Sequence, residues 1–292
     1  MQITNEPSRF HINLEKYPDK IIALIIAVVI VVYVMITIEM VLQPLSRLTF
    51  PDIQPIVSAG LPGKVFPSRI WLHGVNSLEM ARYADEKYTG MEIDVMFDDK
   101  RQCFDVRRPS ASSVGLSLNA LIAEINDPGN HFYWLDFKNL TPANKQNALS
   151  ELCKIAQKYK ILSNIIVESS NPAELVDFSR QGFYTSYYLP DIDPTSVSTE
   201  ILKSHIHVII RNLAAYKVNA LSANSKQYIL IKKYFVNYDL LLWNFTDNPL
   251  ALKLTRYTLM QNHKVKVLLV EDCFTDTCAA IMKKCIPNRN GF

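Results

Sequence analysis

From Ser68 onward, short apolar runs alternate regularly with longer stretches of helical periodicity. This alternation is typical of repeated strand–helix units around a parallel sheet. The predicted strands are Arg69–His73, Met91–Phe97, Phe132–Lys138, Asn164–Glu168, Phe183–Tyr188, Lys217–Leu221, Asp239–Asn244 and Val265–Val270. The predicted helices are Leu78–Lys87, Leu116–Ile125, Pro142–Tyr159, Pro172–Arg180, Val197–Ala215, Ser225–Val236, Pro249–Asn262 and Thr275–Lys284.

Eight such units over about 220 residues match an α/β fold of the (β/α)8 TIM-barrel type. An open doubly wound sheet is the alternative, since sequence alone does not fix the strand pairing. The chain contains no GxGxxG and no Walker loop, which argues against the nucleotide-binding open sheets. We therefore predict a barrel.

A long apolar segment precedes this region. The residues from Ile21 to Ile38 carry no charge and are mostly Ile and Val, and the apolar character continues to Leu42. A helix of about 20 such residues spans the roughly 30 Å hydrocarbon layer of a bilayer. A buried core helix would show a polar stripe, and a cleaved signal peptide would have a shorter apolar core. We predict a single uncleaved transmembrane helix over residues 21–42.

The charges on either side of this segment predict its orientation. Arg9, Lys16 and Lys20 precede it, whereas only Arg47 follows it closely. Positive residues favour the cytoplasmic side, so the N-terminal segment of residues 1–20 is expected in the cytoplasm. The C-terminal domain is then expected in the periplasm or outside the cell.

The domain boundary follows from proline content. Residues 43–67 contain Pro44, Pro51, Pro55, Pro62 and Pro67 and show little periodicity, which is typical of an extended tether. The folded domain is therefore expected to comprise residues 68–292.

Composition excludes two kinds of partner. The 31 basic and 28 acidic residues give a net charge of +3 and form no run of like charges, so we expect no nucleic-acid binding. The five cysteines form no CxxC pair, which argues against a structural zinc.

Acidic residues gather at the C-terminal ends of the predicted strands, where a barrel of this type builds its active site. Period-2 alternation puts Glu92 and Asp94 on one face of the second strand, and Asp136 and Lys138 on one face of the third. Buried unpaired carboxylates are costly, and a hard cation such as Mg²⁺ or Ca²⁺ removes that cost by oxygen ligation. We predict that Glu92, Asp94 and Asp136 bind a divalent cation and that Lys138 binds an anion. A simple buried salt bridge between Asp136 and Lys138 is the alternative.

Other strand ends add further polar or aromatic residues. His73 and Asn76 follow the first strand, and Glu168 and Trp243 lie at the ends of later strands. Taken singly, such residues are more often structural than catalytic, because a tryptophan there usually packs and a lone histidine is usually a core or surface residue.

Taken in order, these segments resemble the menorin family. The resemblance rests on HGVNS from His73, on MEIDVMF from Met91, on WLDFKNL from Trp134 and on Trp243, and it extends from Ser68 to Val270. Menorin proteins group with the glycerophosphodiester phosphodiesterases and sphingomyelinase D toxins among the phospholipase C-like barrels. The resemblance implies that His73 is the first of two catalytic histidines, and that Glu92, Asp94 and Asp136 hold a divalent cation on the phosphate.

One position departs from the family pattern. The second histidine is expected shortly after the E-x-D strand, where this chain reads FDVRRPS with Arg108 in its place. Arginine stays protonated near neutral pH, so it binds phosphate but does not exchange a proton. We therefore place Arg108 at the catalytic position and expect Arg107 or Arg108 to bind phosphate, with Asn76, Lys138, Glu168 and Trp243 as further substrate contacts.

Two functions follow from these residues. The first is a membrane-anchored, metal-dependent phosphodiesterase acting on a phosphorylated lipid or an envelope glycan. The second is a catalytically degenerate barrel that binds a phosphorylated ligand or a protein partner, as the loss of the second histidine would suggest. A purely structural domain leaves the converging His73, Glu92, Asp94 and Asp136 unexplained.

Overall fold

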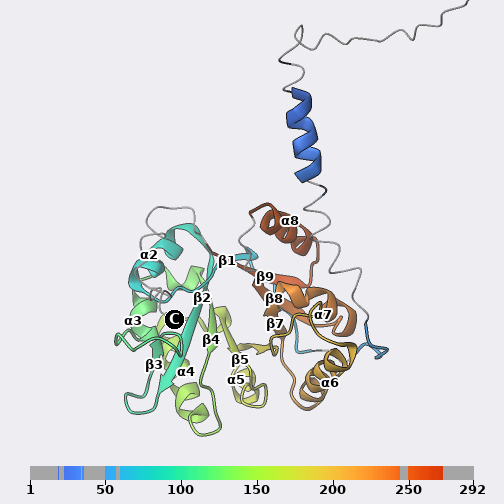
Figure 1. Ribbon diagram of the computed structural model, residues 1–292. Coiled ribbons are helices and arrows are strands. Elements are labelled where there is room, and N and C mark those ends of the chain that lie inside the picture. Colours follow the sequence, from blue (N-terminus) through green and yellow to red (C-terminus); the bar gives the residue numbers. More distant parts are fainter. Residues whose placement is uncertain are drawn as a thin grey trace, which may run out of the picture. The chain divides into compact units, whose positions relative to one another are not determined.

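The computed structural model describes residues 19, 23–33, 35, 50–56, 60–243 and 249–271. The chain divides into two compact units, Met1–Leu48 and Thr49–Phe292. In the first unit, residues 23–33 are helical (Figure 1). Within the described ranges, no helix is both long enough and apolar enough to cross a membrane. Residues 21, 22, 34 and 36–42 of the predicted membrane segment, and the predicted helix Thr275–Lys284, lie outside those ranges.

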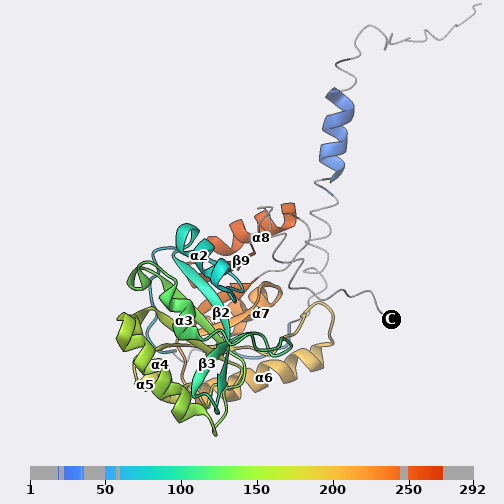
Figure 2. The ribbon, with the colours of Figure 1, turned by 90° about the vertical axis from the view of Figure 1, so that its left-hand side faces the viewer.

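The second unit contains a closed barrel of eight parallel strands, with helices between the strands and around the outside (Figures 1 and 2). β1 pairs with both β2 and β9, and this double pairing closes the barrel. The prediction of a TIM-type barrel is therefore confirmed. The barrel strands are β1 (Ile70–Leu72), β2 (Gly90–Asp98), β4 (Phe132–Phe137), β5 (Ile165–Ser169), β6 (Tyr184–Tyr188), β7 (Ala220–Asn224), β8 (Asp239–Trp243) and β9 (Val265–Val270).

The helices follow the strands in the expected alternation. They are α2 (Leu78–Lys87), α3 (Leu118–Ala123), α4 (Lys145–Tyr159), α5 (Val176–Arg180), α6 (Thr199–Ala215), α7 (Tyr228–Tyr234) and α8 (Pro249–Met260). Single 3-10 turns occupy Pro128–Asn130, Leu162–Asn164 and Ser225–Gln227. α2 has the predicted bounds because Ser77 caps it, its hydroxyl accepting a hydrogen bond from the Met80 N–H at 3.2 Å.

One strand was not predicted. β3 (Cys103–Val106) pairs antiparallel with the second half of β2 and lies outside the parallel series. The turn between them is held by Asp98, whose carboxylate accepts hydrogen bonds from the N–H groups of Lys100 and Arg101. After this hairpin the chain returns to the C-terminal end of the barrel. Arg107 and Arg108 therefore lie beside Asp94, and the Arg107 N–H donates a hydrogen bond to the Asp94 carbonyl at 3.0 Å.

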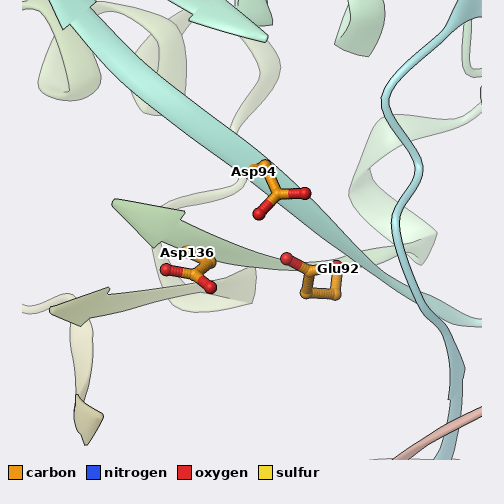
Figure 3. A group of neighbouring side chains, drawn as sticks. All are labelled: Glu92, Asp94 and Asp136. Atoms are coloured by element: carbon orange, nitrogen blue, oxygen red, sulfur yellow. The ribbon is translucent and has the colours of Figure 1, made fainter. Parts of the chain in front are cut away.

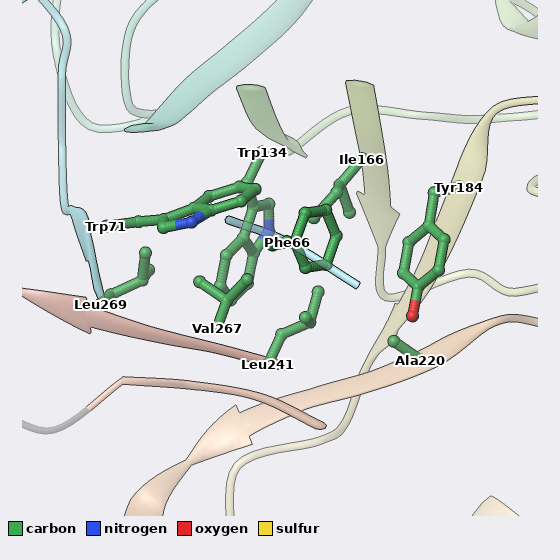
Figure 4. Packing of buried hydrophobic residues seen from close by; sticks show 9 residues of the cluster. All are labelled: Phe66, Trp71, Trp134, Ile166, Tyr184, Ala220, Leu241, Val267 and Leu269. Carbon is green, nitrogen blue, oxygen red and sulfur yellow. The ribbon is translucent and has the colours of Figure 1, made fainter. Parts of the chain in front are cut away.

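The segment before β1 contacts the barrel. The Tyr234 hydroxyl donates to the Pro51 carbonyl at 2.6 Å, and the Leu61 N–H donates to the Val218 carbonyl at 2.9 Å. Phe66 is 6% exposed and packs edge-on against Trp71 and Tyr184, which lie inside the barrel (Figure 4). Residues 51–56 and 60–67 of the segment predicted as a tether therefore help to cover the N-terminal end of the barrel, where Phe66 completes the apolar core.

The start of β2 requires a glycine. A Cβ atom added to Gly90 would lie 2.2 Å from the Trp71 indole, a rigid ring that is fully buried. We expect Gly90→Ala to lower the free energy of unfolding by about 3 kcal/mol, as an overpacked core does. Urea unfolding followed by tryptophan fluorescence measures this effect. Gly129→Ala is the matched control, because its Cβ would approach nothing closer than Asp127 at 3.7 Å. Equal stability of the two variants would contradict this account of the packing.

Candidate active site

A cavity of about 500 Å³ opens at the C-terminal ends of the barrel strands. Eight of the residues predicted from sequence line it: His73, Glu92, Asp94, Arg108, Asp136, Lys138, Glu168 and Trp243. Pro109, Ser110, Trp134, Tyr188 and Leu269 complete the lining. The barrel therefore brings together side chains that are up to 170 residues apart in the sequence, from His73 to Trp243.

Three carboxylates lie side by side on two neighbouring strands (Figure 3). Glu92 and Asp94 come from β2, and Asp136 on β4 is the direct pairing partner of Asp94. Each offers an oxygen that lies within 4.8 Å of the other two. This spacing suits shared ligation of one cation.

Two cations already contact these acids. The Lys138 Nζ lies 2.9 Å from Oδ1 of Asp94 and also contacts Asp136. The Arg108 Nε lies 3.0 Å from Oδ2 of Asp94. Burial alone would raise the pKa of Asp94, but Lys138, Asn76 and Arg108 outweigh it and lower that pKa. Asp94 is therefore ionised and fully paired.

The other acids that line the cavity, Glu92, Asp136 and Glu168, have raised pKa values. Burial, together with the nearby charge of Asp94, raises the pKa of Glu92 to about 7. Burial also raises the pKa of Asp136 and, with the charge of Asp136 added, raises the pKa of Glu168 well above its ordinary value. Within the described residues neither Glu92 nor Glu168 has a Lys or Arg partner, and Oε2 of Glu168 accepts no hydrogen bond.

His73 is held between two carboxylates. Its Nδ1 lies 3.4 Å from Oε1 of Glu271, and its Nε2 lies 3.6 Å from Oε2 of Glu92. Burial opposes protonation of the imidazole, but the hydrogen bond to Glu271 and the charge of Glu92 outweigh burial and raise the pKa of His73. Gly74, at φ +71°, turns the chain after β1 so that its N–H donates to Oε2 of Glu92 at 2.7 Å.

Two predicted residues have other positions. Asn76 supports Asp94: its Nδ2 donates to Oδ2 at 2.7 Å, and its Oδ1 accepts from the Asp94 N–H at 2.9 Å. Arg107, just after β3, pairs with Asp105 at 2.7 Å and lines a separate cavity of about 310 Å³ beside the β2–β3 turn. The structure therefore brings Arg108, but not Arg107, to the carboxylates.

The donor set fits a divalent cation. Five carboxylates, those of Glu92, Asp94, Asp136, Glu168 and Glu271, share the site with Lys138, Arg108 and His73. If all are ionised, the five negative charges exceed the three positive charges by two. A doubly charged cation with oxygen ligands would offset these two charges. The ligands best placed to hold it are Glu92, Asp94 and Asp136.

No family model matches this sequence, and no curated protein matches it. Solved structures with a similar fold include two glycerophosphodiester phosphodiesterases. The one from Parabacteroides distasonis is 13% identical with a TM-score of 0.51, and the match covers 76% of this chain and 100% of that one. The one from Thermotoga maritima is 13% identical with a TM-score of 0.46, and the match covers 72% of this chain and 96% of that one. At this identity the first likeness shows the TIM-barrel fold, and nothing in the comparisons is specific to menorin proteins.

Proposed function

We propose that this chain is a membrane-anchored, metal-dependent phosphodiesterase that acts on a phosphorylated lipid or an envelope glycan. The observation that carries the proposal is the meeting, in one cavity, of three candidate metal ligands, a histidine and two fixed cations. The resemblance of the E-x-D and LDFK segments to menorin proteins supports the same reading, as does the barrel fold shared with a glycerophosphodiester phosphodiesterase.

Each residue has a role in this proposal. A divalent cation held by Glu92, Asp94 and Asp136, Mg²⁺ or Ca²⁺ by its oxygen ligands, would offset charge that develops on the phosphoryl oxygens. Lys138 and Arg108 bind the nonbridging oxygens, because both carry fixed positive charges at the cavity wall. His73 takes a proton from the attacking oxygen through Nε2, while Glu271 holds Nδ1.

A membrane anchor completes the proposal. It rests on the uncharged apolar run of residues 21–38 and on the three basic residues that precede it. With residues 1–20 in the cytoplasm, the barrel would act in the periplasm or outside the cell, where lipid headgroups and envelope glycans are within reach.

The alternative is a barrel that binds a phosphorylated ligand or a protein partner without turnover. Arg108 favours it, because an arginine that pairs with Asp94 at 3.0 Å stands where the family pattern has a histidine. Such a site would bind phosphate but would lack a second group for proton transfer.

Hydrolysis of bis(p-nitrophenyl) phosphate by the purified full-length chain tests the proposal. We expect release of p-nitrophenol in the presence of Mg²⁺, Ca²⁺ or Mn²⁺, loss of release after treatment with EDTA, and recovery when the cation is restored. Binding of inorganic phosphate without release, at every cation tested, would favour the binding module. Failure to bind either cation or phosphate would reject the phosphodiesterase and the phosphate-binding form of the alternative, and would leave only the protein partner.

A further inference from the structure

The cavity has an aromatic wall formed by Trp134, Tyr188 and Trp243. Tyr188 ends β6 and Trp243 ends β8. Glu92 and Asp94 lie on β2, whereas His73, Arg108 and Lys138 lie just after β1, β3 and β4. In the strand order of the closed barrel, β6 lies across from β1, and β8 lies across from β4. The charged groups and the two strand-end aromatic side chains therefore occupy opposite sides of the cavity. A phosphate held by Arg108 and Lys138 would direct one of its ester substituents toward the aromatic wall.

The three aromatic rings form an angled surface, here called a corner, and leave no slot between two parallel rings. Tyr188 and Trp243 stack on each other, with centroids 5.2 Å apart and planes 18° from parallel. A flat base inserted between two parallel rings needs them about 7 Å apart, twice the roughly 3.5 Å contact distance between carbon atoms. Trp134 is tilted by 60° from Trp243, at 6.5 Å between centroids. Such a corner suits a puckered ring that places a C–H face against an aromatic ring.

Buried polar groups beside the wall lack partners. Among the residues that the structure describes, Nε1 of Trp134 and Oε2 of Glu168 have no hydrogen-bond partner, and both side chains are 1% exposed. The indole N–H can only donate, whereas the carboxyl group of Glu168 accepts when it is ionised and can also donate when it is protonated. A hydroxyl group does both, so a ligand with several hydroxyls could satisfy the two atoms at once. An acyl chain would leave both unsatisfied, and a quaternary ammonium group, which neither donates nor accepts a hydrogen bond, would leave the indole N–H unpaired, which is unfavourable in a buried site.

We propose that the aromatic wall binds a saturated, polyhydroxylated ring, a sugar or a cyclitol, esterified to the phosphate of the substrate. This inference rests on the proposed phosphate site and narrows the substrate class. The ring stacks its C–H face on Trp243, the partly exposed tryptophan of the wall, and its hydroxyls reach Nε1 of Trp134 and Oε2 of Glu168.

Calorimetric titration of the full-length chain with four small phosphates tests this inference. Glucose 1-phosphate and myo-inositol 1-phosphate carry the ring, glycerol 3-phosphate carries hydroxyls without a ring, and phosphocholine carries a quaternary ammonium group. We expect at least one ring phosphate to bind about tenfold more tightly than glycerol 3-phosphate. Whichever ring phosphate binds more tightly distinguishes a sugar from a cyclitol.

Two variants test whether Trp243 causes the preference for a ring phosphate. Trp243→Ala should remove the preference for the ring while binding of glycerol 3-phosphate persists. Tyr257→Ala, which truncates an aromatic side chain on α8 that is 69% exposed, should leave the preference unchanged. The wild-type comparison stands even if Trp243→Ala does not fold.

The outcomes separate the two proposals. Equal binding of all four phosphates, or tightest binding of phosphocholine, would overturn the ring inference and leave the phosphate site intact. A ring preference that survives in folded Trp243→Ala would overturn it as well. No binding of any of the four would reject the proposed phosphate site, and the ring inference with it.

Discussion

Glu92→Gln is expected to abolish binding of a divalent cation and to stabilise the cation-free protein above pH 7. Glu92 is buried, and its pKa is raised from 4.5 to about 7. Between these two pH values the unfolded chain has lost this proton while the folded protein keeps it. The free energy of unfolding of the wild type therefore falls as the pH rises through that window. At about 1.4 kcal/mol per pH unit, the loss is on the order of 3 kcal/mol. Glutamine does not ionise, so the variant escapes this loss.

Added Mg²⁺ should reverse the order of stability. A cation that binds only the folded wild type raises its free energy of unfolding in proportion to the logarithm of the cation concentration. Urea unfolding at pH 5 and pH 8, with and without Mg²⁺, measures both effects, and calorimetry measures the cation affinity directly. Glu86→Gln is the matched control, because it makes the same chemical change on the exposed side of α2. Cation binding by Glu92→Gln as tight as in the wild type would remove Glu92 from the metal site.

The barrel strands could be predicted because they are buried on both faces and so appear as continuous apolar runs. β8, with the sequence DLLLW, and β9, with VKVLLV, are examples. β3 could not be predicted in the same way, because its four residues, CFDV, include a buried Asp105 that pairs with Arg101 and Arg107. Those ion pairs lie within the β2–β3 hairpin and leave no periodic apolar signal in the sequence.

Helix starts were less predictable than strands. Pro142 and Pro172 were taken to open their helices, but α4 begins at Lys145 and α5 at Val176. Before α4, Oδ1 of Asn144 accepts a hydrogen bond from the Thr141 N–H at 2.9 Å and closes a turn that includes Pro142. A proline and a preceding polar residue mark a turn as readily as a helix start, so the sequence did not distinguish them.

Most of the candidate site followed from one rule, that polar residues at the C-terminal ends of barrel strands meet in space. The rule also applied to Glu271, which directly follows β9, but this residue was not singled out. Trp134 shares a strand face with Asp136, and the sequence does not show that it lines the cavity, because it also packs in the apolar core of the barrel. The choice between Arg107 and Arg108 needed the structure, since adjacent residues point to opposite sides of an extended chain.

His73→Ala is expected to lower kcat for phosphodiester hydrolysis by about 100- to 10,000-fold, the range for loss of a general acid or base. Binding of the divalent cation should persist, because the three candidate ligands are all carboxylates. His73 is suited to proton transfer because Glu271 holds Nδ1 at 3.4 Å, which leaves Nε2 facing Glu92 and the cavity. Steady-state kinetics and calorimetry on the same preparation measure the two quantities, with His263→Ala, an exposed histidine in the turn before β9, as the control.

Turnover retained in His73→Ala would move proton transfer to another group. Loss of both turnover and cation binding would indicate instead that the imidazole shapes the carboxylate cluster.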